Sequence, residues 1–100
     1  MTYSLRFHKF IAVDFSDSYE WYESQSQGLG ERFIEAVKQK LDAILYLPEA
    51  NSEKYRKGFR EAKVEGFPFV IVYKIMPSHI VFVSTIHHVK KHSKNKYRNP

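Results

Sequence analysis

The sequence contains no cysteine, and its 100 residues include only four glycines and four prolines. Without cysteine the chain has no disulfide, no thiolate metal site and no cysteine nucleophile, and the absence fits a reducing compartment. No apolar run approaches the roughly 20 residues that a membrane helix needs, and residues 1–7 lack the apolar stretch of a signal peptide. We therefore expect a soluble, cytoplasmic protein with no membrane partner.

Acidic residues are absent after Glu65, and this divides the chain into halves of opposite charge. Residues 1–53 carry five Lys or Arg against nine Asp or Glu, a net charge of −4. Residues 54–100 carry eleven Lys or Arg against two Asp or Glu, a net charge of +9. A basic half is typical of a protein that binds a polyanion or an acidic protein. It also fits a solvated terminus with no specific role.

The length predicts one domain over residues 1–100, with residues 88–100 as a basic tail. Aromatic side chains make up 16% of the chain, and their large buried area is enough for a core without disulfides or metals. No cofactor is predicted. The histidines of the basic half lack the i, i+4 helical spacing with a carboxylate that indicates a zinc site. Gly28-Leu29-Gly30 follows a predicted helix and is a turn, not a phosphate-binding loop.

Two neighbouring segments show helical periodicity. One apolar stripe, over about residues 10–25, consists of Ile11, Phe15, Tyr19 and Tyr22. A second stripe predicts a helix over residues 29–47, which ends before Pro48 because proline lacks the N–H donor and restricts its predecessor. The break at 25–28 is short, so we expect an antiparallel helical hairpin.

The remaining apolar segments have the pattern of strands. They cover residues 2–8, 59–65, 67–75 and 80–87. Tight breaks join the last three strands, which predicts an antiparallel meander. Burial of every apolar stripe then requires the helical hairpin to pack on one face of the sheet. The predicted fold class is α+β, in the order β-α-α-β-β-β, with a mainly antiparallel four-stranded sheet.

The basic half contains residue types suited to RNA cleavage without a metal. This reaction needs cations at the scissile phosphate and a group that moves the 2′-hydroxyl proton. The candidates are Arg60, Lys63 and His87, with Glu61, Glu65 and His88 as further acid–base groups. We expect Glu61, Lys63 and Glu65 on one sheet face, where such a ladder is more often a solvated surface with weak ion pairs. Alternation sends His87 and His88 to opposite faces, so only one can join a given site.

Three stretches carry more specific motifs. The first is Trp21-Tyr22-Glu23-Ser24-Gln25 followed by Gly28-Leu29-Gly30-Glu31-Arg32-Phe33. The second is Phe59-Arg60-Glu61-Ala62 leading into Gly66-Phe67-Pro68-Phe69-Val70-Ile71-Val72-Tyr73. The third is His87 with Lys90 and Lys91, followed by Tyr97-Arg98. Together these motifs, which span nearly the whole chain, resemble the RelE/ParE superfamily of toxins from type II toxin–antitoxin modules, with Phe69 where tyrosine is usual. The helical motif is more similar to the ParE-like, plasmid-stabilisation members.

The resemblance implies a growth-inhibiting toxin that a cognate antitoxin neutralises, with operator DNA bound only through the antitoxin. An acidic or amphipathic antitoxin segment would suit the +9 half. ParE-like members poison DNA gyrase, and this target is favoured because no compact catalytic constellation stands out. The alternative is a RelE-like endonuclease that cuts mRNA on the ribosome with Arg60, Lys63 and His87. A non-toxic nucleic-acid-binding domain on the same scaffold, or a degenerate toxin, is a further alternative, since fold does not fix function.

Binding of the antitoxin or target is assigned to a separate set of residues. They are Lys74, Lys90, Lys91, Lys94, Tyr97 and Arg98. Tyr97 lies among cations and could stack on a base. It could equally dock on the body of the protein and anchor the tail.

Overall fold

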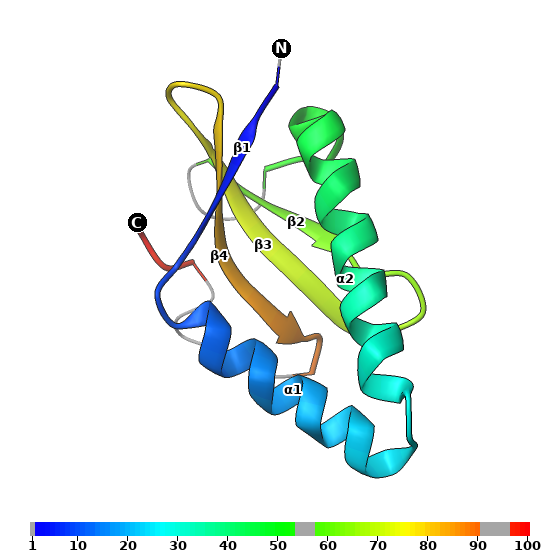
Figure 1. Cartoon of the computed structure of the whole chain (residues 1–100). Coiled ribbons are helices and arrows are strands. Elements are labelled where there is room, and N and C mark those ends of the chain that lie inside the picture. Colours follow the sequence, from blue (N-terminus) through cyan, green and yellow to red (C-terminus); the bar gives the residue numbers. More distant parts are fainter. Residues whose placement is uncertain (1, 54–57, 91–96) are drawn as a thin grey trace.

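The computed structural model describes residues 2–53, 58–90 and 97–100, and its elements follow the predicted order (Figure 1). They are β1 (Ser4–Phe7), α1 (Ile11–Gln25), α2 (Leu29–Tyr46), the 3-10 helix η1 (Pro48–Ala50), β2 (Phe59–Lys63), β3 (Phe69–Met76) and β4 (Ile80–His88). No helix within these ranges combines the length and the apolar character needed to cross a membrane. The helix bounds agree with the sequence prediction to one residue at each end.

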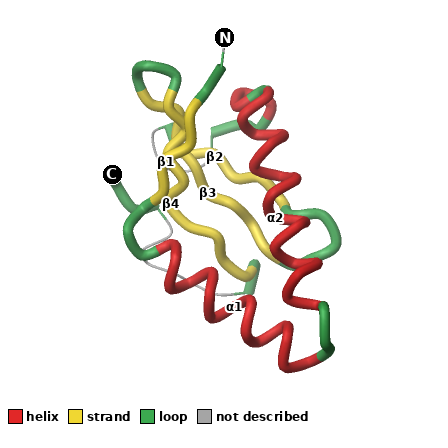
Figure 2. The backbone as a smooth tube through the Cα atoms, viewed as in Figure 1, coloured by secondary structure: helices red, strands yellow, loops and turns green. Residues whose placement is uncertain are grey.

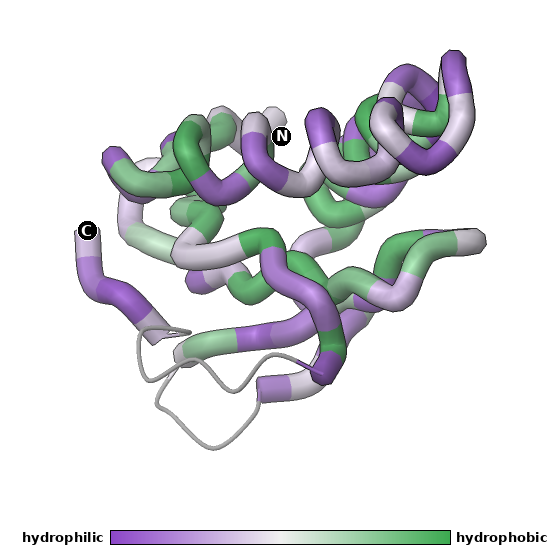
Figure 3. Tube along the Cα trace, turned by 90° about the horizontal axis from the view of Figure 1, so that it is seen from below, coloured by the Kyte–Doolittle hydropathy of each residue, from purple (hydrophilic) through white to green (hydrophobic). Residues whose placement is uncertain are grey.

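The four strands form one sheet in the order β1-β4-β3-β2 (Figure 2). β1 pairs with β4 in parallel, and the other two pairings are antiparallel. Seen from below, α1 and α2 lie on one side of this sheet, and the last residues of the chain lie on the other side (Figure 3). The predicted helical hairpin on one face of a mainly antiparallel sheet is therefore confirmed.

The turn between β2 and β3 begins earlier than the sequence predicted. The backbone N–H of Val64 donates to the carbonyl of Phe69 at 2.9 Å, and Gly66 takes a φ of +80° inside the loop that this bond closes. A positive φ favours glycine because it has no Cβ. β2 consequently ends at Lys63, so Glu65 lies in the turn and not on the sheet face where we expected it.

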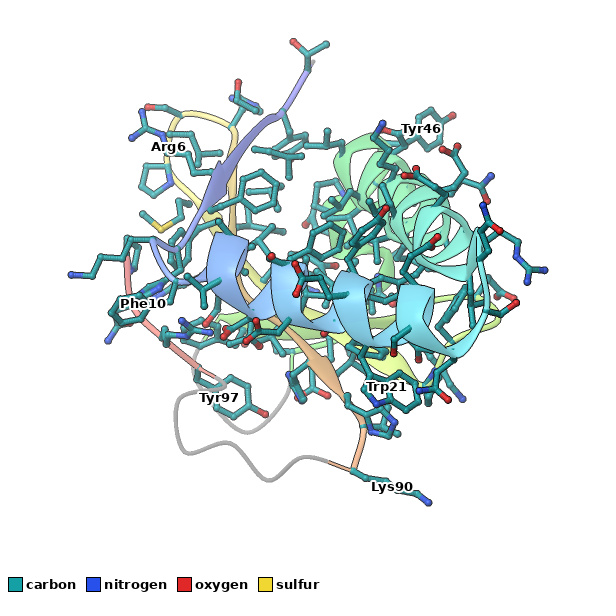
Figure 4. The ribbon with its side chains drawn as sticks, turned by 60° about the horizontal axis from the view of Figure 1, so that its bottom comes forward. Arg6, Phe10, Trp21, Tyr46, Lys90 and Tyr97 are labelled. Carbon is teal, nitrogen blue, oxygen red and sulfur yellow. The ribbon has the colours of Figure 1, made fainter. Side chains whose placement is uncertain are left out.

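An aromatic cluster joins the helical hairpin to the sheet. Phe33 of α2 is fully buried, and its ring centroid lies 4.8 Å from that of Phe69 and 5.1 Å from that of Tyr22. Such tilted pairs contribute beyond the area they bury. Trp21 is 58% exposed (Figure 4), and its ring meets that of Tyr22 edge-on, with 5.1 Å between the centroids, at the solvent-facing side of this cluster. Of the predicted stripe, Ile11 and Tyr22 belong to the core and Phe15 packs against it, whereas the Tyr19 hydroxyl reaches the exposed carboxylate of Glu31.

The first motif is explained by the turn between the helices. The carboxylate of Glu23 accepts the N–H of Gly28 and the N–H of Gly30, each at 2.9 Å, at the amino end of α2. These N–H groups have no partner within the helix, and the helix dipole favours a negative charge there. A Cβ on Gly30 would lie 2.7 Å from the ring of Tyr19. The glycines and the glutamate of this motif therefore hold the hairpin together.

Candidate functional site on the outer face of the sheet

The two faces of the sheet differ in what covers them. Ile71, Tyr73 and Val83 point to the helices and belong to the core. Residues paired directly across strands share a face. The face that the helices do not cover, which we call the outer face, carries Arg6, Phe59, Glu61, Lys63, Val70, Val72, Lys74, Phe82, Thr85 and His87.

Lys63 and His87 lie in one row across the outer face. Lys63 pairs with Val70, and Val70 pairs with His87. Two strand spacings separate them, so their Cα atoms are about 10 Å apart. The hydroxyl of Thr85 lies 3.1 Å from Nδ1 of His87 and orients the ring. The structure thus places two of the three predicted nuclease residues on one surface.

Arg60 is on the opposite face from Lys63 and His87. It pairs with Tyr73, so its side chain lies on the side of the helices. Its guanidinium donates to the carbonyl of Asn51 and lies 3.7 Å from the carboxylate of Glu53, and the side chain is 17% exposed. Arg60 therefore ties the segment after η1 to the sheet. The predicted convergence of Arg60, Lys63 and His87 is not observed.

His88 lies on the helix side of the sheet, as alternation predicted for one member of the histidine pair. Its ring centroid is 5.4 Å from that of Phe69. Its Nδ1 accepts the backbone N–H of Lys90 at 3.1 Å. His88 therefore ends the strand and packs against the core, and it does not reach the outer face.

Tyr97 docks on the outer face, so of the two alternatives left open by the sequence the structure shows the anchor. Its hydroxyl donates to the carboxylate of Glu61 at 2.8 Å. Its ring centroid lies 5.3 Å from that of Phe59. Both partners come from β2, at one edge of the sheet.

Arg98 continues this contact toward the other edge of the sheet. Its backbone N–H donates to the hydroxyl of Ser84 at 2.6 Å. The register shifts at this point between β3 and β4. Val72 pairs with Thr85 and Tyr73 pairs with Val83, so Ser84 has no partner residue in the strand pairing. The Arg98 guanidinium lies 2.6 Å from the carboxylate of Asp14 in α1, and its side chain is 13% exposed. We call Tyr97 and Arg98 together the strap.

The strap ends beside the connection between β1 and α1. Nη1 of Arg98 lies 3.2 Å from Nδ1 of His8, and the guanidinium carbon lies 5.8 Å from the ring centroid of Phe10. Figure 4 shows Phe10 and Tyr97 at the same end of the molecule. Both strap residues are thus engaged by the protein's own side chains.

The remaining predicted binding residues are less concentrated. Lys74 is on the outer face, and its Nζ lies 5.1 Å from the ring centroid of Phe59. Lys90 follows β4 and is exposed (Figure 4). Lys91 and Lys94 fall outside the described residues. Among the residues that the structure describes, no group of three or more His, Asp or Glu is placed to hold a metal ion.

Comparison with known proteins identifies the family. The sequence matches the ParE toxin of the type II toxin–antitoxin system, parDE, over residues 5–92. The chain belongs to the ParE toxin family. A comparison of this ParE-family chain with proteins of curated function gives no match.

Solved structures share the fold of this ParE-family chain. One is the chromosomal ParDE toxin–antitoxin system of P. aeruginosa, with a TM-score of 0.75 and 15% identity, covering 86% of this chain and 95% of that one. Another is the isolated E. coli RelE toxin, with a TM-score of 0.65 and 22% identity, covering 92% of this chain and 88% of that one. At these identities the similarity concerns the fold.

Sequence reasoning missed the residues that hold the strap. Asp14 and His8 are separated from Arg98 by 84 and 90 positions. Ser84, which accepts the backbone N–H of Arg98, is 14 positions from it and lies at the irregular point of the strand pairing. No local pattern relates these residues to Arg98, so the sequence of this ParE-family chain offered no signal for them.

Proposed function

We propose that this ParE-family toxin inhibits growth by binding DNA gyrase and does not cut RNA itself. The observation that carries the proposal is the position of Arg60 on the helix side, where Asn51 and Glu53 engage its guanidinium. Cleavage of RNA by the predicted set requires both cations and the acid–base group to meet at one phosphate. Arg60 faces away from Lys63 and His87. The family match supports the same choice.

The gyrase proposal is tested by two measurements on the same protein. Purified toxin is expected to inhibit supercoiling by gyrase, and its expression is expected to induce a DNA-damage response while messenger RNA stays intact. His87→Ala should leave both effects unchanged, because the ring has no catalytic role in this mechanism. Ribosome-dependent mRNA cleavage that disappears in His87→Ala would overturn the proposal.

A RelE-like endonuclease is the second candidate, and one observation favours it. Lys63 and His87 share the outer face about 10 Å apart, close enough for both side chains to reach one phosphate. In this case Lys63→Ala and His87→Ala would each abolish cleavage of ribosome-bound mRNA. Lys38→Ala, an exposed lysine of α2, is the matched control and should retain full cleavage.

We also propose that a cognate antitoxin neutralises the toxin through an acidic or amphipathic segment. The net charge of +9 over residues 54–100 supports this, as does the family. The P. aeruginosa structure with the same fold is a ParDE toxin–antitoxin system. Opposite charge speeds association and makes it depend on salt.

Co-expression tests the antitoxin proposal. The small protein encoded beside the toxin gene should restore growth and co-purify with the toxin. Replacement of Lys74 and Lys90 by Glu should weaken the complex at low salt more than at high salt. The toxin alone should not retain operator DNA in a mobility-shift assay, whereas the complex should. Growth that stays arrested despite the co-expressed protein would contradict the proposal.

A further inference from the structure

The guanidinium of Arg98 sits between an imidazole and a carboxylate. On one side Nη2 lies 2.6 Å from the carboxylate of Asp14. On the other side Nη1 lies 3.2 Å from Nδ1 of His8. The same nitrogen of His8 accepts the backbone N–H of Phe10 at 3.2 Å. Nδ1 of His8 therefore faces two N–H groups from different segments of the chain.

These partners define the protonation state of His8. A guanidinium and a backbone N–H can only donate hydrogen bonds, so Nδ1 has to present its lone pair to them. His8 is consequently the neutral imidazole with its proton on Nε2. A proton on Nδ1 would turn the acceptor into a donor, break both bonds and place an imidazolium against the guanidinium.

We propose that Arg98, His8 and Asp14 form a latch that holds the strap on the outer face, and that the latch opens when His8 is protonated. The strap covers Glu61 and Phe59 of β2 and the hydroxyl of Ser84 in β4. Opening exposes these groups beside the row of Lys63 and His87. Acidity thereby controls access to the outer face, whichever target the toxin binds.

The surroundings of His8 also favour its neutral form. Burial lowers the pKa of His8 from its usual 6.5, and the positive charges of Arg98 and Lys9 lower it further, while Asp14 opposes them. On the side of the sheet, the ring of His8 faces the ring of Phe82, with 6.3 Å between the centroids, and Phe82 does not titrate.

The sign of the pH dependence follows from this shift. The docked strap prefers neutral His8, so docking is fully favoured above the ordinary pKa of about 6.5 and weakens as the pH falls below it. Because one proton is involved, the ratio of docked to released strap falls by at most about tenfold per pH unit.

NMR of the full chain tests the latch. The amide signal of Arg98 and the ring signals of Tyr97 are followed from pH 8 down to pH 4, with Arg98→Ala as the reference for a released strap. In the wild type the Tyr97 signals should move toward those of Arg98→Ala as the pH falls. In His8→Asn they should stay at the docked position, because the Asn oxygen can accept from Arg98 but does not titrate.

A second histidine serves as the matched control. His79 lies at the turn between β3 and β4 with a φ of +58°, which asparagine tolerates. His79→Asn should keep the wild-type pH dependence. The proposal is overturned if the wild-type signals do not move, if they move equally in His8→Asn, or if they move only below about pH 4.5, where a carboxyl group would be responsible.

Discussion

Replacing Glu23 by Ala tests the physical account of the helical hairpin. The carboxylate of Glu23 accepts two backbone N–H groups, those of Gly28 and Gly30, at 2.9 Å each. Truncation leaves both donors at the start of α2 without a protein partner. Water can reach them in part, because Glu23 and Gly28 are half-buried.

The cost can be estimated from related contacts. Hydrogen bonds to charged groups contribute about 1.5–3 kcal/mol each when they are well shielded, and loss of a helix cap costs about 0.5–2 kcal/mol. Because water can partly replace the lost carboxylate, we expect Glu23→Ala to lower the free energy of unfolding by about 2 kcal/mol, less than two fully shielded hydrogen bonds would contribute. Glu23→Gln keeps one acceptor oxygen and should lose about 1 kcal/mol.

Urea unfolding followed by circular dichroism measures both variants. Glu20→Ala is the matched control, because Glu20 is an exposed glutamate of the same helix and its loss should change the stability by no more than about 0.5 kcal/mol. A loss of 2 kcal/mol would lower Tm by roughly 8–16 °C in a domain of this size. Equal stability of Glu23→Ala and Glu20→Ala would refute the capping role.

Three further substitutions test the core and the loop contacts by the same unfolding measurement. Gly30→Ala should lower the free energy of unfolding by about 1–3 kcal/mol although alanine favours helix, because the new Cβ meets the ring of Tyr19. An increase in stability would contradict a close contact between α1 and α2 at this position. Phe33→Ala should lose about 3–5 kcal/mol, and a loss below 2 would contradict its central place in the core. Tyr73→Phe should lose about 1–2 kcal/mol, because its buried hydroxyl donates to Pro48 at 2.6 Å. Burial raises the pKa of Tyr73, so the wild type should lose stability above about pH 10, where only the unfolded phenol ionises. Tyr73→Phe should lose less stability than the wild type over the same pH range. An equal loss in both proteins would contradict the raised pKa of Tyr73.

The predicted helices and sheet were correct because their signals are local. Val37 and Leu41 follow Phe33 at helical spacing, and all three are buried. The sequence also indicated which face of the sheet carries Arg60. Arg60 alternates with Ala62 and Val64, which are buried, so period two already placed it opposite Lys63. Grouping residues by charge alone obscured that signal.

The sequence by itself determined the order of elements, the apolar stripes and the charge asymmetry, because each depends on neighbours a few positions apart. Only the tertiary structure decided which residues from distant parts of the chain meet on one surface. The contact between Arg98 and Asp14 spans 84 positions, and the backbone N–H of Arg98 is held by Ser84 of β4. Side chains so distant along the chain meet because β1 pairs with β4 and α1 packs against β4, and no sequence period encodes that distance.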